Sequence, residues 1–499
     1  MAATHPQRRA ARREPMSKVD TAWLRMERPT NPMMITGVLM LAEPLTIAKL
    51  RKVVKTRFLA YSRFRQRAVD GAAGAAWQED EHFDLDWHVR LSALPGRETR
   101  RGARAEAAEK RALERFVSQL ASTPLDASRP LWQFHLVERY RGGSALVARI
   151  HHSYADGIAL VQVLLSLTDT ARDPAPDKAL ARAWLRQDGA QVARRVGAVE
   201  RYRRLGGKVL GKGMEMVQDP GLAAMLAREG GEIARELLQA LALPDDPPSI
   251  LRGSLGVSKR VAWAEPLDLD EVKAVGRACD CTVNDVLMAA AAGALRSYML
   301  ARGEAVDGMR LRATVPVNLR PLEHAKKLGN HFGLVFLDLP VGEGNPVRRL
   351  ECVAECMDRL KDSRQAVVAY GLLAALGMAP QALQGPALDL LSRKATAVAT
   401  NVPGPQQPLY MAGSRVAELM FWVPQTGSIG LGISIFSYDG RVHFGLIADG
   451  RLVPDPDAVI GRFRPEFEKL LYLAMMGDWE RALASVDADG LLERGMAGS

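Results

Sequence analysis

The amino-acid sequence predicts a mixed α/β (α+β) protein with two domains, and three observations lead to this fold class. At 499 residues the chain is too long for one ordinary hydrophobic core. A hydrophobic content of 47% with 25% charged residues is typical of globular proteins. Strand-like and helix-like patterns are mixed on both sides of an Arg- and Ala-rich segment without a strand pattern. We therefore expect a basic, disordered extension (1–16), an N-terminal domain (17–172), a helical linker (173–250) and a C-terminal domain (251–499).

In the N-terminal domain, the most unusual motif of the chain is expected at the end of a hairpin. The elements predicted before it are a strand at 33–41, a helix at 46–61 and two strands at 131–140 and 144–150. The pair Gly142-Gly143 joins the last two strands and is a hairpin signal. The second of these strands leads directly into HHSYADG, and the apolar run after that motif predicts a helix.

The C-terminal domain is expected to alternate in the same way. Its predicted elements are helices at 268–278, 282–300 and 457–475, strands at 309–320, 329–341 and 396–403, and a hairpin over 430–449. Thr282 or Asn284 is expected to cap the second helix. The strand at 329–341 is nearly all apolar, so we expect it to be central in its sheet. The hairpin should turn at Asp439-Gly440.

The charge balance favours an anionic partner, because the net charge is +10 and the pI is about 9.5. Aromatic residues make up 6% and no nucleic-acid-binding motif is visible, so nucleic acid is not an expected partner. An anionic membrane or lipid-droplet surface fits better. No apolar run is long enough for a membrane span, and the N-terminal residues lack the apolar stretch of a secretory signal. We expect a cytoplasmic protein.

The four cysteines do not predict a metal or redox site. They are Cys279, Cys281, Cys352 and Cys356. Their C-x-C and C-x3-C spacings match neither a zinc ribbon nor a thioredoxin motif. Ordinary burial on a helix explains them, and no disulfide framework is expected.

The motif HHSYADG contains His151, His152, Asp156 and Gly157, and the residues alone leave three interpretations open. His152 and Asp156, four residues apart, could share a helix face as metal ligands do, but a third ligand is missing, so we expect no metal. The histidines could also be buried and hydrogen-bonded for structure only. Gly157 suggests a tight or positive-φ turn at a strand-to-helix junction, where loops often carry function.

General-base catalysis is the third interpretation. A neutral imidazole, with an ordinary pKa of about 6.5, can take a proton from a hydroxyl, thiol or amine. The sequence holds no G-x-S-x-G elbow that would supply a serine nucleophile. The base would therefore act directly on the acceptor substrate, without a covalent enzyme intermediate.

HHSYADG has the form HHxxxDG and resembles the signature of the acyl-CoA-dependent acyltransferase superfamily, which includes chloramphenicol acetyltransferase and condensation domains. Further segments resemble, in order, the motifs of the bacterial bifunctional wax ester synthase/diacylglycerol acyltransferases: RPLWQFHLVE, TVNDVLMAA, VPVNLR, LGNHFGLVFLDLP, TNVPGPQQPLYMAG and FSYDGRVHFGLIADG. The resemblance covers residues 16–475. Family members begin near a D-x-x-x-L-x-x-E segment, here Asp20 to Glu27, so either the residues before Met16 are an extension or Met16 is the start.

This resemblance implies both a fold and a reaction. The fold would be two chloramphenicol-acetyltransferase-like halves with an active-site tunnel between them. The reaction would pass a long-chain acyl group from acyl-CoA, a co-substrate rather than a bound cofactor, to diacylglycerol or a fatty alcohol. The products would be triacylglycerol or wax esters, made at the inner membrane or at lipid inclusions.

The resemblance also implies roles for the motif residues. His152 would be the base, with His151 beside it. Asp156 would hold the loop through an arginine, for which Arg320 of PVNLR is our candidate.

The ND pair, Asn284 and Asp285, leaves two roles equally open: an Asn284 amide that donates to the oxyanion or orients His152, or a helix cap. The PLW residues, Pro130, Leu131 and Trp132, are expected to be packing that positions the strand before the histidines. The segment 401–405 is expected to shape the tunnel wall.

Two rival functions remain at this point. A condensation-type enzyme would take its acyl group from a carrier protein, but the downstream motifs resemble the lipid branch more closely. A catalytically silent lipid-surface protein of the same fold is the other rival, and the intact HHxxxDG motif argues against it.

Overall fold

The computed structural model describes residues 13–71, 74–95, 102–173, 242–319, 330–361, 363, 365–378 and 381–477. Three predicted features lie outside these residues: most of the N-terminal extension (1–12), nearly all of the helical linker (174–241) and Arg320.

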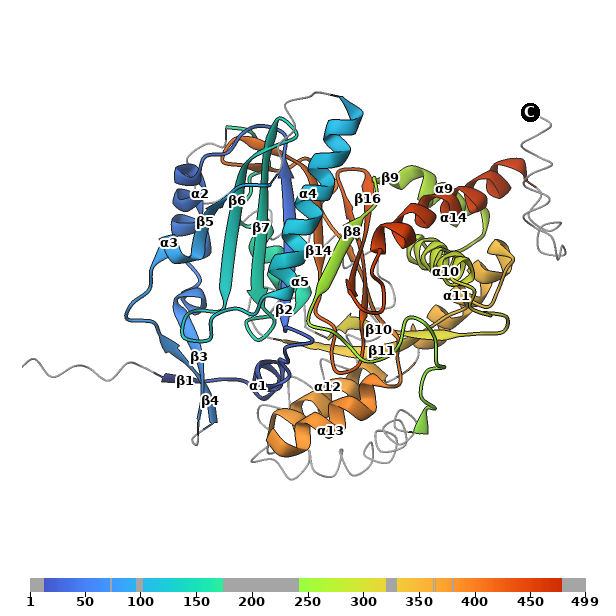
Figure 1. Cartoon of the computed structure of the whole chain (residues 1–499), viewed down its shortest axis with the longest axis horizontal. Coiled ribbons are helices and arrows are strands. Elements are labelled where there is room, and N and C mark those ends of the chain that lie inside the picture. Colours follow the sequence, from blue (N-terminus) through green and yellow to red (C-terminus); the bar gives the residue numbers. More distant parts are fainter. Residues whose placement is uncertain are drawn as a thin grey trace, which may run out of the picture.

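Six strands form the first sheet, in the order β13-β14-β2-β7-β6-β5. Their bounds are β2 Met34–Leu41, β5 Val89–Ser92, β6 Trp132–Tyr140, β7 Gly143–His151, β13 Tyr410–Met411 and β14 Ser414–Trp422. Two of these strands, β13 and β14, come from the C-terminal half, and β14 pairs antiparallel with β2 along most of its length. The two halves expected from the sequence therefore share a sheet (Figure 1).

The second sheet has the order β11-β10-β12-β15-β16-β8, and β9 also pairs with β16. Its strands are β8 Lys259–Trp263, β9 Leu267–Asp268, β10 Leu311–Asn318, β11 Phe332–Leu339, β12 Ala397–Pro403, β15 Leu431–Tyr438 and β16 Arg441–Asp449. The prediction that the apolar strand at 329–341 is central was wrong, because β11 is an edge strand paired with β10. Its apolar side chains are buried by helices instead, as the cluster of Val335 with Ala366 shows.

Helices cover both sheets and fill the space between them. They are α1 Lys18–Arg25, α2 Ile47–Val53, α3 Leu85–His88, α4 Ala103–Ser122, α5 Gly157–Leu165, α9 Leu269–Ala278, α10 Val283–Ala301, α11 Pro346–Lys361, α12 Gln365–Met378, α13 Gln381–Ser392 and α14 Pro456–Met476. The helix expected over 46–61 is shorter, because α2 passes into a π-helical turn (Val54–Phe58). A short 3-10 turn (Ser62–Arg65) and a small sheet of β1 Arg13–Pro15, β3 Gln66–Gly71 and β4 Gly74–Glu79 follow.

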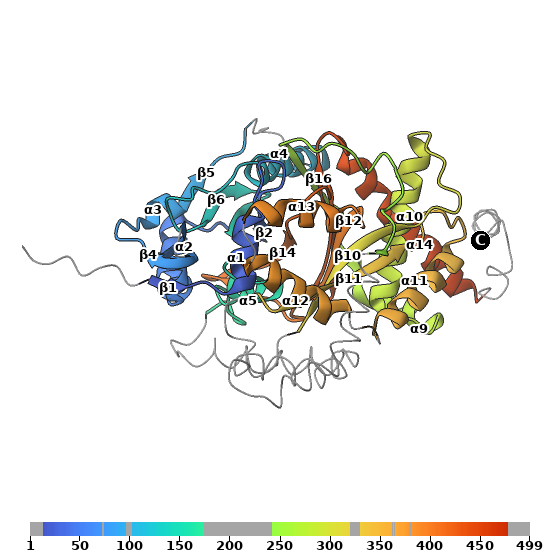
Figure 2. The same ribbon diagram turned by 90° about the horizontal axis from the view of Figure 1, so that it is seen from below.

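Each face of the sheets has its own core. α4 lies between the sheets, where its Leu113 and Val117 share a cluster with Val147 of β7 and Trp263 of β8. α5 and α2 cover the other face of the first sheet, and α9, α10 and α14 cover the second. α1, α12 and α13 lie across the lower end of both sheets in Figure 1, and Figure 2 shows them from below.

Both expected hairpins are present. The first turns at Arg141 and Gly142, both with positive φ, one residue earlier than the glycine pair suggested. Gly143 lies inside β7, where a Cβ would come within 1.9 Å of the Leu41 carbonyl oxygen. The second turns at Asp439-Gly440, again with positive φ at both residues, as the two-residue turn requires.

Three sequence expectations concern absences. The four cysteines are free thiols in the structure. Among the described residues, no group of His, Cys, Asp and Glu could hold a metal ion. No single described helix is long and apolar enough to cross a membrane, although α9 and α10 together reach the required length with a 98° bend between them.

A buried polar cluster ties the N-terminal segment to the second sheet. Asn31, which precedes β2, donates from Nδ2 to the carbonyls of Gly427 (2.9 Å) and Ile429 (3.3 Å). The buried Lys259 ammonium donates to Asn31 Oδ1 at 2.6 Å and lies 3.7 Å from the Asp449 carboxylate. Burial lowers the pKa of Lys259 to about 8, so this side chain is still charged at neutral pH.

Replacing Asn31 with Ala should destabilise the protein, because it removes a hydrogen bond from a buried ammonium and leaves two buried carbonyls without this donor. We expect the free energy of unfolding at pH 7, measured by urea denaturation, to fall by about 2 kcal/mol. The loss should shrink at pH 9.5, where Lys259 has lost its proton and no longer buries a charge. An Asn31→Ala protein as stable as the wild type at pH 7 would contradict this interpretation.

Candidate active site

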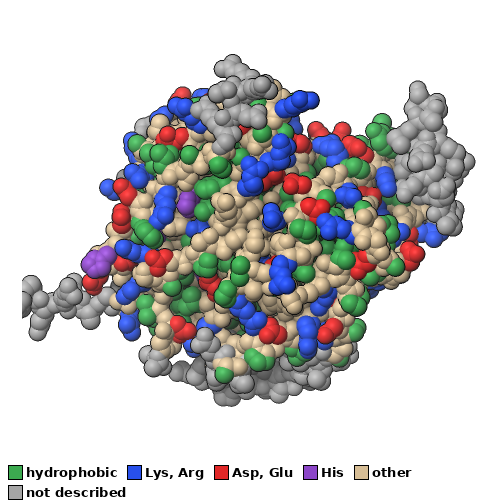
Figure 3. All heavy atoms as spheres, viewed as in Figure 1, with side chains coloured by type: hydrophobic (Ala, Val, Ile, Leu, Met, Phe, Trp, Pro, Cys, Tyr) green, Lys and Arg blue, Asp and Glu red, His purple; other side chains and the backbone are tan. Residues whose placement is uncertain are grey.

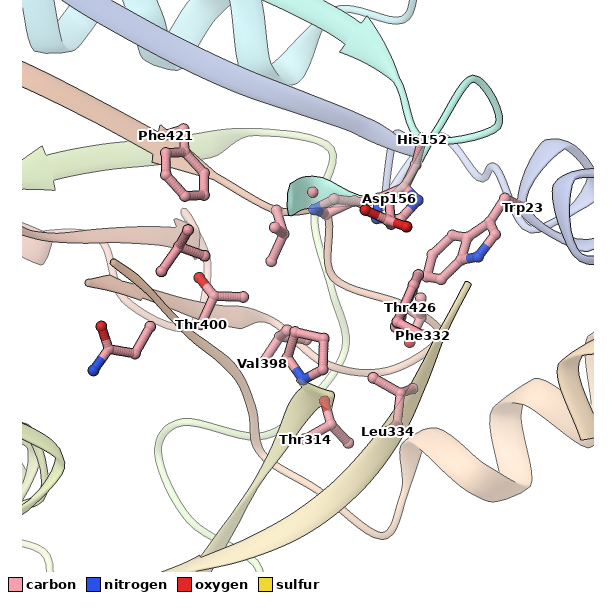
Figure 4. Close-up of a pocket in the computed structure, with 16 residues that line it drawn as sticks. Trp23, His152, Asp156, Thr314, Phe332, Leu334, Val398, Thr400, Phe421 and Thr426 are labelled. Atoms are coloured by element: carbon pink, nitrogen blue, oxygen red, sulfur yellow. The ribbon is translucent and has the colours of Figure 1, made fainter. Parts of the chain in front are cut away.

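One pocket lies where the two sheets meet, and it is lined from both. α1 contributes Trp23, and the junction of β7 and α5 contributes His152, Asp156 and Gly157. The opposite wall comes from β10, β11 and β12, and a third side comes from the end of β14 and the segment after it. The cavity holds about 760 Å³ of empty space, including its open mouth. Figure 4 shows His152, Asp156 and Trp23 together on one side of it.

The strand-to-helix junction presents its residues to the pocket as the sequence suggested, with one difference. β7 ends at His151, and α5 begins at Gly157 with Asp156 as its N-cap, since Asp156 Oδ1 accepts from the Ala159 N–H at 2.8 Å. Of the tight or positive-φ turn expected at Gly157, the positive φ is absent, because this glycine is the first residue of α5. Gly157 lines the pocket, and a Cβ at this position would make contact with Val423 Cγ1 at 3.4 Å.

The two histidines have different surroundings. Both ring nitrogens of His151 have hydrogen-bond partners. Nδ1 accepts from the Ser153 N–H at 3.1 Å and lies 2.8 Å from Ser153 Oγ. The ring proton is therefore assigned to Nε2, which donates a hydrogen bond to Glu27 at 2.8 Å. His151 does not line the pocket, whereas His152 does. The His152 Nδ1 is buried, and no described residue gives it a well-formed hydrogen bond. His152 is therefore the histidine available for chemistry.

α1 and Glu27, which lies two residues after the end of this helix, hold both histidines. Trp23 stacks on the His152 ring, with centroids 4.1 Å apart and an interplanar angle of 25°. Glu27 binds His151. Asp20 accepts from Asn330 Nδ2 at 2.8 Å, and the same amide group donates to the His152 carbonyl at 2.9 Å. Asp20 and Trp23, three residues apart, lie on the same side of α1, whereas Glu27 follows the helix.

Sequence reasoning missed two of these residues. It noted Asp20 and Glu27 only as the start of the family resemblance, and it assigned nothing to Trp23 or Asn330. The i, i+3 spacing of Asp20 and Trp23 was a visible signal for one shared helix face. Asn330 carried no such signal, because its partners are 178 and 310 residues away in the sequence.

Burial sets the protonation of the site. Burial, and to a smaller extent the neighbouring His151, lower the pKa of His152 to about 3, although contacts with the His152 carbonyl and Asn330 oppose the shift. His152 is therefore neutral at physiological pH, the form in which an imidazole accepts a proton. Burial also raises the pKa of Asp20, although its hydrogen bonds with Asn330 and Ser17 oppose this.

Asp156 connects the start of α5 to the segment that precedes β11. Besides capping α5 through Oδ1, it accepts from the backbone N–H of His331 through Oδ2 at 3.3 Å. Asp20 and Asp156 thus both hold the start of the segment 330–331 against the histidine loop. The predicted pairing of Asp156 with Arg320 involves a residue outside the described part of the chain and stays a prediction.

The PLW residues make packing and backbone contacts. Trp132 is fully buried, donates from Nε1 to the Phe64 carbonyl at 2.8 Å and stacks on His88 with a 4.3 Å centroid distance. The Leu131 carbonyl accepts from the His151 N–H at 2.9 Å, and the Pro130 carbonyl accepts from the Trp132 N–H at 2.8 Å. These contacts position the end of β7 on which the histidines lie.

The ND residues do not line the pocket. Asp285 forms a capping box with Thr282 at the start of α10, so of the two expected caps Thr282 is the one present. Asn284 Oδ1 accepts from Asn401 Nδ2 at 2.8 Å, and Asn401 does line the pocket. Asn284 therefore reaches the pocket through Asn401, and this placement does not support direct contact of Asn284 with an oxyanion or with His152.

A buried, neutral histidine in a cavity between two sheets is an arrangement suited to acyl transfer by general-base catalysis, and comparison with known proteins agrees with it. Residues 16–287 match the wax ester synthase/diacylglycerol acyltransferase catalytic domain, and residues 328–471 match the WS/DGAT C-terminal domain. The chain belongs to this family and is an acyltransferase.

Relatives and solved structures support the same family and fold. A candidate diacylglycerol O-acyltransferase of Mycobacterium tuberculosis is 30% identical over 501 residues, which cover 95% of this chain and 94% of that protein. The wax ester synthase/diacylglycerol acyltransferase from Marinobacter aquaeolei VT8 superposes with a TM-score of 0.63 at 24% identity, covering 92% of this chain and 99% of that one. The starter condensation domain of rhizomide synthetase, solved with C8-CoA, gives a TM-score of 0.52 at 15% identity over 93% and 95% of the two chains. The two-domain mixed α/β fold expected from the sequence is thereby confirmed.

The low pKa of His152 predicts an unusual pH profile. A base works in its unprotonated form, so lowering its pKa extends activity to lower pH. We expect kcat/KM for acyl transfer to stay nearly constant from about pH 8 down to about pH 5 rather than fall near the ordinary histidine pKa of about 6.5. Trp23→Leu opens the ring to water and should raise the pKa, so that activity falls below about pH 6.

Trp23→Phe is the matched control, since it keeps an aromatic cover and should keep the flat profile. A wild-type profile that already falls with a midpoint near pH 6.5 would show that His152 is not held neutral by burial.

Proposed function

We propose that the protein transfers a long-chain acyl group from acyl-CoA to the hydroxyl of diacylglycerol or a long-chain fatty alcohol, with His152 as the general base and without an acyl-enzyme. The observation that supports this proposal most is the position of the neutral His152 on the wall of a largely apolar pocket that both sheets build. The diacylglycerol O-acyltransferase names of the mycobacterial relatives favour diacylglycerol as the acceptor.

The pocket wall suits a hydrocarbon chain. Phe332, Leu334 and Phe421 line it with apolar side chains. Two threonines on the same wall, Thr314 and Thr400, donate their hydroxyls to strand carbonyls at 3.4 Å, so they do not require a polar group from a ligand. Each buried methylene of a ligand contributes about 0.8 kcal/mol, which favours long acyl chains over short ones.

The proposed reaction needs one proton acceptor, His152, which is regenerated at the end of each cycle. The His152 imidazole takes the proton of the acceptor hydroxyl, and the oxygen attacks the thioester carbonyl. When the tetrahedral intermediate collapses, the C–S bond breaks, and the imidazolium returns the proton to the departing CoA thiolate. Burial makes the imidazolium costly in the free enzyme, but in the reaction it forms beside a developing negative charge that stabilises it.

Two other functions are weaker. Condensation domains share the fold at low identity, and a carrier-bound acyl group is the donor that such an enzyme would need. A catalytically silent protein would have no use for a histidine that burial keeps neutral beside an open cavity.

The decisive experiment supplies purified protein with radiolabelled palmitoyl-CoA and either dioleoylglycerol or hexadecanol, and resolves the products by thin-layer chromatography. We expect labelled ester from the wild type and at least a 10²-fold loss in His152→Ala, because a general base typically contributes about 10²–10⁴-fold. His82→Ala, a change at an exposed histidine, is the control and should keep full activity. Folded wild type that forms no ester with either acceptor would refute the proposal and favour a carrier-bound donor.

We also propose that the protein works in the cytoplasm, bound peripherally to an anionic membrane or to lipid inclusions. Its proposed acceptors are insoluble in water, and its net charge of +10 favours an anionic surface. On the face shown in Figure 3, Lys and Arg side chains are interspersed with Asp and Glu, so on that face the attraction would come from net charge rather than from one basic patch.

Sedimentation with lipid vesicles tests this location. We expect binding to vesicles that contain phosphatidylglycerol, little binding to pure phosphatidylcholine, and release as salt rises, because exposed charges are screened over about 10 Å at 0.1 M salt. Equal binding to both kinds of vesicle at high salt would rule out electrostatic attraction as the cause.

A further inference from the structure

Two neighbouring strands of the second sheet separate close to the pocket. β10 and β12 pair at only two positions, Ala313 with Ala397 and Thr314 with Val398. Beyond these pairs each strand continues with its other neighbour, β10 with β11 as far as Asn318 and β12 with β15 as far as Pro403. The sheet is therefore interrupted between β10 and β12 along several residues.

Residues of both strands line the pocket at this interruption, which is called here the passage between β10 and β12. Val398, Thr400 and Val402 line it from the face toward His152, as alternate residues of one strand do. Asn401 lines the pocket too, although its position in the strand directs its side chain to the opposite face, where it bonds Asn284 of α10. Pro316 of β10 lines the same passage from the other strand.

The two asparagines at this passage have hydrogen-bonding groups that the protein does not fully use. Asn401 Nδ2 donates to Asn284 Oδ1 at 2.8 Å, which leaves Asn401 Oδ1 as a hydrogen-bond acceptor. Asn284 Nδ2 has the Met357 sulfur as its partner at 3.6 Å, and a thioether is a weak acceptor. Both asparagines are half-buried. An acceptor and a poorly used donor side by side are complementary to the N–H and C=O of a secondary amide.

We propose that the passage between β10 and β12 holds the pantetheine arm of the acyl donor, and that Asn401 and Asn284 recognise one of its amides. This inference rests on the proposed use of acyl-CoA. The arm is the part of such a donor that carries secondary amides next to the thioester, and an amide enclosed by protein without a hydrogen-bond partner is costly. The acyl chain gains nothing from an asparagine pair and lies instead on the His152 side, among Phe332, Leu334 and Phe421.

The proposal assigns the ND asparagine a positioning role. Asn284 orients Asn401 across the sheet, and Asn401 touches the donor. The capping box of Thr282 and Asp285 fixes the first turn of α10, on which Asn284 lies.

The test compares two donors of the same acyl chain with one acceptor. One donor is the palmitoyl thioester of pantetheine, which carries the amides, and the other is the palmitoyl thioester of butanethiol, which carries none. In Asn401→Leu, kcat/KM for the pantetheine thioester should fall more than that for the butyl thioester, so that their ratio drops by about three- to tenfold, the effect of one hydrogen bond. Asn284→Ala, a change well tolerated in a helix, should lower the same ratio and guards against a folding defect in the first variant.

Thr400→Val is the matched control on the same strand, and it should change kcat/KM for both donors by the same factor. Equal losses for both donors in Asn401→Leu, or an altered chain-length preference with an unchanged donor ratio, would overturn the proposal, the latter by placing the acyl chain in the passage. A wild type that esterifies with neither donor nor with palmitoyl-CoA would overturn the proposed function, and this inference with it.

Discussion

The antiparallel pairing of β14 with β2 is the constraint on which the active site depends. It places a strand from the C-terminal half in the sheet that carries the histidines. The end of β14 and the residues after it, including Phe421 and Val423, then form one wall of the pocket. Because the hydrogen bonds of a sheet fix register as well as distance, this wall is held opposite His152. The Asn31 and Lys259 contacts hold the two sheets together nearby.

Within this frame, burial rather than a charged partner keeps neutral the histidine that we propose as the base. Trp23 covers one face of the imidazole, and Asn330 holds the backbone carbonyl of the same residue. Acidic side chains act through the neighbours of His152: Glu27 accepts a hydrogen bond from the His151 ring. Asp20 and Asp156 accept hydrogen bonds from the backbone N–H groups of residues 330 and 331. The ring of His152 itself stays neutral and unused, which is the state a base needs before substrate arrives.

The pocket combines a largely apolar wall with a polar residue, Asn401. Threonine hydroxyls on the wall are already paired within the sheet, whereas Asn401 keeps an acceptor free and lies at the break between β10 and β12. In the proposed donor complex, this division would give the apolar and the amide-bearing parts of the thioester different places to bind. It also accounts for the proposed positioning role of the ND asparagine, Asn284, which bonds Asn401 rather than His152.

The sequence by itself determined the local features: the hairpin turns, which need residues tolerant of positive φ, the strand-to-helix junction at HHSYADG, and the Thr282 cap. It also led to His152 and to the family, because motif order along the chain is a sequence property. Tertiary structure alone decided the edge position of β11, the membership of β14 in the first sheet, and the contacts of Trp23 and Asn330 with His152. These features depend on contacts between separate segments of the chain. Apolar runs or spacing within one segment carry no information about which other segment will cover it.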